Sequence, residues 1–352
     1  MSESAEQLKF QFGKEEIYYD KYVAASEKKN IKFLGYDLEQ LQNSGKDLLA
    51  ETLRKAGFEW NDLQGILPSF NDSAYITLGC HASYNSVTVE KDGRAYAKLD
   101  SGTAHTTHTC AYSPQEADVE LGALRPKQSL MGGYLPILFN LYQGDERTLE
   151  GMYFCDLCDA DFAPAMVVRN VIYENASGKV LSEEYLLAGL DGSGKRRKLE
   201  HEVFWDAFLT QIAYWKKFEQ ETAAVELPVP ELKRAYLGCL MAADGMFTGS
   251  RAHYGSRWYR HETSDNFPPN FITSAMAFFR CGQTRRVKEI LTEMLSHSVD
   301  VKGRFIYRQG ENQRYAASGA EYGQILWVIA ECARVVTPSG WLADYADKLA
   351  RM

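Results

Sequence analysis

The sequence predicts a multidomain α and β protein, with an N-terminal antiparallel β-sandwich followed by helical hairpins. Between residues 74 and 190, short runs rich in Val, Ile, Thr and Tyr alternate with turn residues, which is typical of antiparallel sheets. After residue 196 the apolar spacing changes to the helical period of about 3.6. We therefore expect a sandwich domain over residues 1–195, a linker helix over 196–228 and a helical-hairpin domain over 229–352.

The composition is that of a soluble globular protein that is long enough for two cores. Of its 352 residues, 45% are hydrophobic and 24% are charged, which are ordinary values for a globular chain. The formal net charge is -8. This acidic balance argues against general nucleic-acid binding, which usually requires a basic surface.

The expected location is the cytoplasm, with no membrane partner. The first ten residues, MSESAEQLKF, lack the apolar core of a secretory signal. No stretch reaches the roughly 18 apolar residues that a membrane helix needs. The seven cysteines, an odd number in a large chain, favour reduced thiols over a disulfide framework.

Turn residues divide the predicted sheet region into strands, after a first helix candidate at Leu38–Lys55. Tyr84–Glu90 and Arg94–Leu99 flank Lys91, Asp92 and Gly93. An Asp-Gly pair in this position predicts a hairpin, because glycine readily adopts a positive φ. Further strands are predicted over Leu130–Tyr142, Thr148–Cys155, Phe162–Glu174 and Val180–Ala188, with a turn at Asn175–Gly178 between the last two.

Apolar spacing predicts a long linker helix and shorter helices after it. Apolar residues from Val203 to Phe218 fall on one broad face, and Pro228 and Pro230 break the chain beyond them. A short extended excursion is expected at Gly303–Arg308. The later helices are predicted over Glu231–Phe247, Phe271–Phe279, Thr284–Ser298, Ala320–Val336 and Trp341–Leu349.

The densest group of chemically versatile residues is Arg251–Pro269, which reads RAHYGSRWYRHETSDNFPP. It holds three arginines, two histidines and two acids, and it connects two predicted helices. Functional groups often lie on such a connection, because the rigid elements on either side hold it in place. We therefore expect the rim of an active site here.

A family resemblance follows from this stretch. The pattern H-Y-G-x-x-W-Y-R-x-E, at residues 253–262, comes after a predicted sandwich and linker helix and lies among helical hairpins. In motif and element order the chain resembles the six-hairpin glycosidase superfamily from about Ala74 onward. The resemblance implies a catalytic (α/α)6 toroid, of which this chain supplies about half of the roughly twelve helices. A longer enzyme, or a partner chain in a homo- or hetero-oligomer, would complete this partial toroid.

The resemblance also implies catalytic acids. Arg260, His261 and Glu262 resemble the segment that carries the general acid in inverting rhamnosidase-like members, which gives Glu262 that role. Ser318–Trp327 resembles the start of a later inner helix in which an acid points into the cavity, and Glu321 is the acid of this segment.

The chemistry of glycoside cleavage requires a second carboxylate, about 5 to 10 Å from the acid. Asp265 follows Glu262 by three residues, so on a helical turn the two would share a face, and their repulsion would help to keep one protonated. The second carboxylate is therefore Glu321, Asp265 or an acid outside this chain. Surface capping explains Glu262 and Asp265 equally, and a helix-start carboxylate explains Glu321.

Aromatic and cationic side chains are expected to hold the sugar. A sugar ring stacks on an aromatic face, and arginine donates to hydroxyls or to a carboxylate. Trp258 and His253 are also compatible with places in the core. The predicted substrate-binding residues are His253, Arg257, Trp258, Tyr259, Arg260 and Trp327.

No cofactor and no metal are predicted. Cys155 and Cys158 have C-x-x-C spacing but lack a second pair, so we interpret them as buried strand-end thiols. His105, His108 and Cys110 lack a distant fourth ligand, and we interpret them as part of an ordered polar loop. Glycine-rich phosphate-binding patterns are absent where a strand would meet a helix.

These observations predict a carbohydrate-active protein, most simply a glycoside hydrolase that cleaves oligosaccharides or small glycosides by carboxylate acid–base catalysis. Its partner would be carbohydrate. Two alternatives stay open. One is a non-catalytic subunit or sugar-binding protein that a partner chain completes. The other is a polysaccharide lyase, in which Tyr259 or His253 abstracts a proton and an arginine neutralises a uronate.

Overall fold

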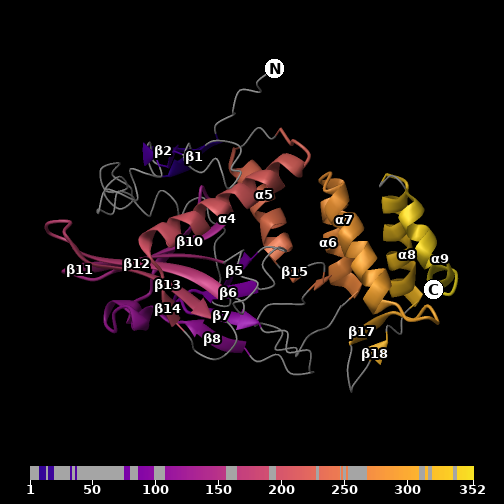
Figure 1. Ribbon diagram of the computed structural model, residues 1–352, viewed down its shortest axis with the longest axis horizontal. Helices are drawn as coiled ribbons and strands as arrows, with labels where there is room; N and C mark the ends of the chain where they lie inside the picture. Colours follow the sequence, from indigo (N-terminus) through magenta and orange to yellow (C-terminus); the bar gives the residue numbers. More distant parts are fainter. Residues whose placement is uncertain are drawn as a thin grey trace.

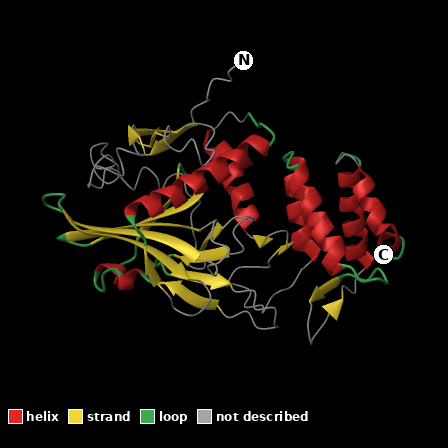
Figure 2. Ribbon diagram, viewed as in Figure 1, coloured by secondary structure: helices red, strands yellow, loops and turns green. Residues whose placement is uncertain are grey.

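The computed structural model is a mixed α and β protein with two antiparallel sheets and several helices (Figure 1). Strands dominate its N-terminal half and helices its C-terminal half (Figure 2), which confirms the predicted mixed class and order. The residues described are 8–12, 15–19, 32–33, 36–37, 75–79, 86–98, 108–155, 165–189, 196–226, 230–245, 247–248, 251–252, 268–308, 314–315, 319–335 and 339–352. The helix predicted at Leu38–Lys55 lies outside them.

The first sheet has four strands that follow one another in sequence order. The hairpin predicted around Gly93 is confirmed: Gly93 has a φ of 81°, and its N–H donates to the Glu90 carbonyl at 2.8 Å. Glycine reaches this φ without the steric cost that other residues meet. The strands are β5 (Tyr75–Gly79), β6 (Ser86–Glu90), β7 (Ala95–Lys98) and β8 (His108–Tyr112).

The second sheet has six strands in the order β14-β13-β12-β11-β10-β9. The single strand predicted over Leu130–Tyr142 is wrong, because Gly132 and Gly133 have φ values of 61° and 80° and make a tight turn. The other predicted strands of this region are confirmed within a few residues. The strands are β9 (Lys127–Met131), β10 (Leu135–Gln143), β11 (Arg147–Cys155), β12 (Ala165–Glu174), β13 (Val180–Gly189) and β14 (Arg196–Lys198).

The two sheets pack against each other. β5 lies against β10 and β11, and β8 lies against β13. Alternate residues of each strand point to this interface, where apolar side chains form a buried cluster. The cluster contains Ile76, Leu78, Val87, Val89, Ala95, Ala111 and Tyr112 of the first sheet and Leu138, Tyr153, Cys155, Met166, Val168, Leu186 and Ala188 of the second.

The opposite face of the six-stranded sheet is covered by helix α4 (His201–Glu221) (Figure 1). The ring of Phe154 on β11 lies 5.7 Å from that of Phe204 and 6.0 Å from that of Phe208. The predicted apolar face of this helix is confirmed apart from Val203, which is 50% exposed. The same hydrophobic cluster continues from the sheet through α4 into the later helices, so the two halves share one core. The domain boundaries at 195 and 228 remain predictions.

In the described residues after α4 there are five helices, and their predicted positions are largely confirmed. The exception is Trp341–Leu349, where a 3₁₀ segment, Ser339–Tyr345, precedes a single helical turn. A π-helical turn, Met294–Ser298, continues α7. The helices are α5 (Pro230–Gly245), α6 (Pro268–Arg280), α7 (Thr284–Glu293), α8 (Gly319–Ala333) and α9 (Ala346–Leu349).

Short strand pairs accompany both halves. The predicted extended excursion at Gly303–Arg308 contains β17 and is confirmed. The pairs are β1 (Leu8–Phe12) with β2 (Glu15–Tyr19), β3 (Lys32–Phe33) with β4 (Tyr36–Asp37), β15 (Phe247–Thr248) with β16 (Arg251–Ala252), and β17 (Ile306–Arg308) with β18 (Arg314–Tyr315).

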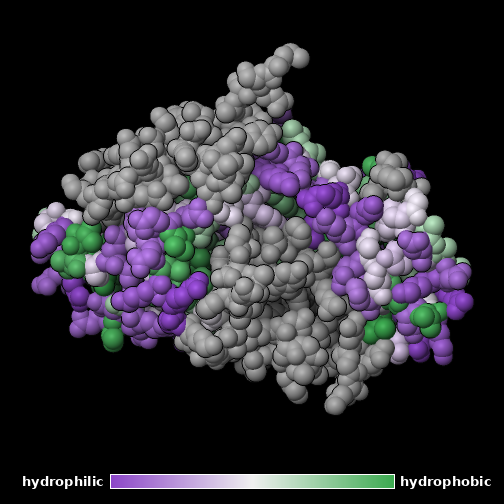
Figure 3. Space-filling model, in the orientation of Figure 1, coloured by the Kyte–Doolittle hydropathy of each residue, from purple (hydrophilic) through white to green (hydrophobic). Residues whose placement is uncertain are grey.

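The later helices lie in a row beyond the sheets (Figure 1), where α6 packs on α5, α7 and α8. They do not close a ring within the described part of the chain. None of the described helices is long and apolar enough to cross a membrane. On the face in view, the described surface is mostly hydrophilic, and its hydrophobic patches are small and separate (Figure 3).

Candidate functional site

Most of the predicted site lies outside the described residues. This applies to the whole run from residue 253 to residue 267, between β16 and α6. The structure therefore neither supports nor contradicts these assignments. The residues concerned are His253, Arg257, Trp258, Tyr259, Arg260, Glu262 and Asp265.

The two remaining predicted residues lie on α8. Glu321 is half-buried in the first turn of this helix, and Trp327 is 48% exposed farther along it. Neither side chain lines the cleft described next. The structure thus leaves Glu321 and Trp327 outside this cleft.

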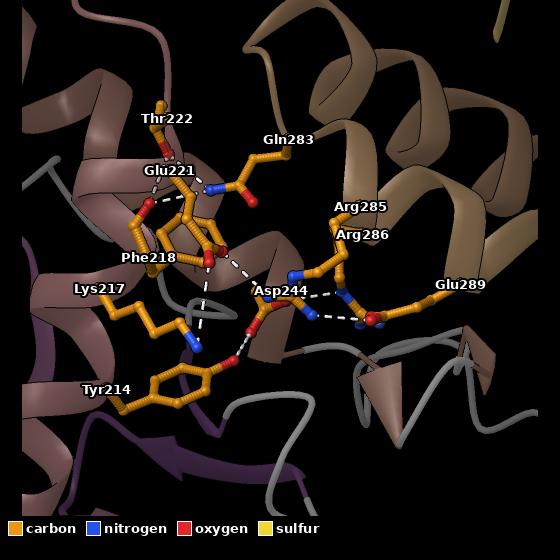
Figure 4. Close-up of polar contacts among 10 residues, drawn as sticks. All are labelled: Tyr214, Lys217, Phe218, Glu221, Thr222, Asp244, Gln283, Arg285, Arg286 and Glu289. Atoms are coloured by element: carbon orange, nitrogen blue, oxygen red, sulfur yellow. Dashed lines mark hydrogen bonds and ion pairs between the residues drawn. The ribbon is translucent and has the colours of Figure 1, made fainter. Parts of the chain in front are cut away.

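This cleft lies between α4, the end of α5 and the start of α7 (Figure 4). Its volume is about 160 Å³, which corresponds to roughly five water molecules at about 30 Å³ each. Most of the residues that line it are polar or charged, although their carbon atoms provide most of the exposed wall. The cleft is lined by Tyr214, Lys217, Phe218, Glu221, Asp244, Gln283, Arg285 and Arg286.

The turn between α6 and α7 is hydrogen-bonded to the end of α4. Gln283, which is 3% exposed, donates its side-chain amide to the Phe218 carbonyl at 2.9 Å and to the Thr222 hydroxyl at 2.8 Å. The backbone N–H of Ala223 donates to the Cys281 carbonyl at 2.6 Å. One bond satisfies the Phe218 carbonyl in the last turn of α4, and another satisfies the Cys281 carbonyl just after α6, groups that the helices themselves leave open. These bonds therefore fix the start of α7 against α4.

Asp244 is the buried centre of the cleft. Its side chain has no exposed surface and accepts hydrogen bonds from the Tyr214 hydroxyl at 2.7 Å and from Arg286 Nε at 3.0 Å (Figure 4). The guanidinium of Arg286 also lies over the ring of Phe247, 4.7 Å from its centroid, where the ring face attracts the cation. A buried carboxylate needs such partners because burial removes its water.

Charged side chains form the rim of the cleft. Arg285 donates to Glu221 at 2.9 Å and to Glu289 at 2.7 Å, and Lys217 Nζ lies 4.0 Å from Glu221. Burial lowers the pKa of Arg285, but its hydrogen bond to Glu221 and the charge of Glu289 outweigh that effect and raise it above the ordinary value. The side chains of Arg285 and Lys217 are 54% and 70% exposed, so a ligand can reach both.

Asp244 was missed by the sequence analysis, although a signal for it exists. Leu237, Leu240, Met241 and Asp244 follow the spacing i, i+3, i+4 and i+7, so the acid falls on the apolar face of α5. All four are buried. An acid in that position must find a partner inside the protein, and this requirement marks it as a candidate for function.

The metal candidates of the sequence lack support. Among the described residues, no three His, Cys, Asp or Glu side chains gather around a point where an ion could bind. Cys155 is a buried thiol at the end of β11, as predicted. The polar-loop interpretation is wrong for His108 and Cys110, because both belong to β8, which pairs with β7. Cys158 and His105 lie outside the described residues.

Comparison with known proteins adds no relative. The chain matches no protein-family model, no curated protein and no solved structure. The resemblance to six-hairpin glycosidases therefore rests on the motif and on the order of elements. The cleft itself combines a fixed carboxylate, a tyrosine hydroxyl, an amide and exposed cations, which together suit a small polar ligand.

Proposed function

We propose that the protein is a glycoside hydrolase and that its substrate binds in the cleft between α4 and α7. The observation that carries the proposal is Asp244, a fully buried carboxylate on the wall of that cleft. It lies seven residues before Arg251, where the predicted catalytic connection begins. Chain connectivity thus links the cleft to the stretch that contains Glu262.

In this proposal the two acids have separate roles. Glu262 protonates the leaving oxygen, as the family resemblance implies, and Asp244 is the second carboxylate. Tyr214 and Arg286 hold Asp244 in one orientation, which keeps its charge fixed as positive charge develops on the sugar. Asp244 takes the role that the sequence left open between Glu321 and Asp265.

The other side chains of the cleft suit a sugar. Tyr214 and Phe218 offer aromatic faces, and Lys217 offers a donor for sugar hydroxyls. The volume of about 160 Å³ favours a single ring over a length of polymer. Small imported glycosides are therefore the proposed substrates, in a cytoplasmic protein whose helices form part of an α/α toroid.

The test is a screen of aryl glycosides with the wild type, Asp244→Asn and Glu262→Gln. We expect the wild type to cleave at least one substrate and each variant to lose about 10²-fold or more in kcat, the range for acid–base groups. Asp347→Asn, at an exposed acid on α9, is the matched control and should keep the full rate. Full activity in Asp244→Asn would remove Asp244 from the mechanism, and no cleavage of any glycoside would contradict a hydrolase.

A sugar-binding protein without catalysis is the second candidate. Both oxygens of Asp244 accept hydrogen bonds from the protein, Oδ1 from Arg286 and Oδ2 from Tyr214, which also fits a purely structural ion pair. Calorimetric titration with monosaccharides separates the two candidates. Sugar binding without turnover favours the binding protein, whereas turnover excludes it.

A further inference from the structure

Among the side chains that line the cleft, cations outnumber acids by one. The lining side chains are three cations, Lys217, Arg285 and Arg286, and two acids, Glu221 and Asp244. Arg286 and Asp244 form their own buried pair, with side-chain exposures of 2% and 0%. At the rim, Lys217 and Arg285 share Glu221 as the acid that lines the cleft with them, and Arg285 also pairs with Glu289, which does not line it.

The contacts of Glu221 are of the kind that a ligand can replace. Glu221 ends α4, and its side chain is 33% exposed. Its oxygens lie 2.9 Å from Arg285 and 4.0 Å from Lys217. Exposed pairs of this type contribute little to stability, whereas the planar guanidinium of an arginine can bind an incoming carboxylate or phosphate through two parallel hydrogen bonds.

The backbone adds to the positive field at the same place. Gln283, Arg285 and Arg286 belong to the start of α7 and line the cleft. The first turn of α7 contains no acid, and the Gln283 side chain is directed to α4 instead of capping its own helix. The positive end of the helix dipole therefore adds to the charge of Lys217 and Arg285.

We propose that the cleft recognises an anionic group, a carboxylate or a phosphate, on a small sugar. Lys217 and Arg285 bind this group, and Glu221 competes with it for the same two cations. The inference rests on the proposed function, because the sugar part of the ligand comes from there. It extends that function by naming acidic sugars as the substrate class.

Calorimetric titration of the full chain with glucose, glucuronate, glucose 6-phosphate and inorganic phosphate tests the inference. We expect an acidic sugar to bind at least about tenfold more tightly than glucose, since a hydrogen bond to a charged group contributes enough for such a difference. Comparing glucuronate with glucose 6-phosphate distinguishes a carboxylate from a phosphate. Inorganic phosphate that binds as tightly as both acidic sugars would overturn the sugar part of the inference.

Variants of the rim sharpen the test. Arg285→Ala and Lys217→Ala should each weaken binding of the acidic sugar several-fold, and Glu221→Gln should strengthen it because the competitor is lost. Arg334→Ala, at an exposed arginine in the turn after α8, is the matched control and should change nothing. Circular dichroism checks that each variant is folded. Weaker binding in Glu221→Gln, or equal affinity for glucose and glucuronate, would overturn the inference.

The outcomes also separate this inference from the proposed function. Tight binding of an acidic sugar without hydrolysis of any aryl glycoside, neutral or acidic, would support the anion site and contradict the hydrolase. Hydrolysis of neutral glycosides without measurable binding of glucuronate or glucose 6-phosphate would support the hydrolase and contradict the anion site.

Discussion

The two halves of the molecule bury polar side chains in different ways. Between the sheets, Tyr112 and Asn170 exchange hydrogen bonds of 3.1 and 2.8 Å, and apolar side chains enclose them. Among the helices, Asp244 and Arg286 form an ion pair that lines an open cleft. A buried ion pair is weak evidence for stability, so its place beside a cleft indicates binding or chemistry.

The tyrosines of the sheet interface reinforce this contrast. Burial raises the pKa of Tyr112 and Tyr142 well above the ordinary value and that of Tyr153 to about 12. These hydroxyls therefore stay protonated at any ordinary pH. The cluster between the sheets is built on neutral side chains, whereas the cluster in the helical half is a buried ion pair beside a cleft whose exposed charges belong to Lys217 and Arg285.

The largest effect should come from breaking the ion pair in the helical half. Asp244→Ala leaves the buried guanidinium of Arg286 without its carboxylate, which we expect to cost about 3 to 5 kcal/mol in the free energy of unfolding. Urea unfolding measures this change. The double variant Asp244→Leu/Arg286→Leu, which removes both charges, should recover most of the loss. A double variant as unstable as the single one would show that the pair stabilises the fold by itself.

The next effect should come from the hairpin of the first sheet. A Cβ added at Gly93 would lie 1.7 Å from the buried hydroxyl of Tyr142. The φ of Gly93 is 81°. Gly93→Ala should therefore lower the free energy of unfolding by about 2 to 4 kcal/mol, because the added methyl group overpacks the site and alanine is strained at a left-handed φ.

Gly282 in the helical half provides the matched control. Its φ is 80°, and an added Cβ would lie 3.3 Å from the Cβ of Ala223. This contact is tight but needs only a small shift, so the backbone cost of about 1 to 2 kcal/mol dominates for Gly282→Ala. Thermal unfolding of both variants compares them. Equal losses would mean that the contact between Gly93 and Tyr142 has no energetic weight.

A smaller loss is expected from the neutral network between the sheets. Tyr112→Phe removes the hydroxyl that bonds Asn170, but the Asn170 amide still donates to Glu184 at 3.0 Å. We therefore expect the free energy of unfolding in urea to fall by about 1 to 2 kcal/mol, within the range for one unsatisfied buried group. The proposed hydrolase activity should not change. An activity loss in this variant would contradict the purely structural role of the sheet interface.

The features that the sequence predicted well are those set by local chemistry. Asp92-Gly93 specifies its hairpin because a positive φ is needed there, and the apolar and aromatic residues that end Thr148–Cys155 favour a strand. The turn at Gly132-Gly133 was missed because the apolar run on either side reads as one strand. The Gly-Gly pair is itself a local turn signal that the apolar residues around it concealed.

The candidate site was less predictable because it depends on contacts between distant segments. Tyr214, Asp244 and Arg286 belong to three helices, and no local motif connects them. The sequence does place an acid, Asp244, on an apolar helix face. This position indicates that the acid has a buried partner, but it does not identify the partner. The roles assigned to Glu262 and its neighbours stay predictions.

The smallest effect concerns His201, at the junction of the two halves. Its Nε2 accepts a hydrogen bond from the Trp205 indole at 2.9 Å, and its ring lies 5.6 Å from that of Tyr185 on β13. Burial lowers the pKa of His201, and the negative charges of Glu183 and Glu202 offset only part of this effect.

Because the folded pKa of His201 lies below the unfolded value of about 6.5, the unfolded chain binds the proton first on acidification. The contribution of His201 to stability should be complete above about pH 6.5 and should fall as the pH drops through that value toward the folded pKa. Urea midpoints between pH 7 and pH 5 measure this slope. His201→Gln keeps an acceptor for Trp205 and should flatten the slope. An unchanged slope in His201→Gln would mean that other groups set the acid sensitivity of the junction.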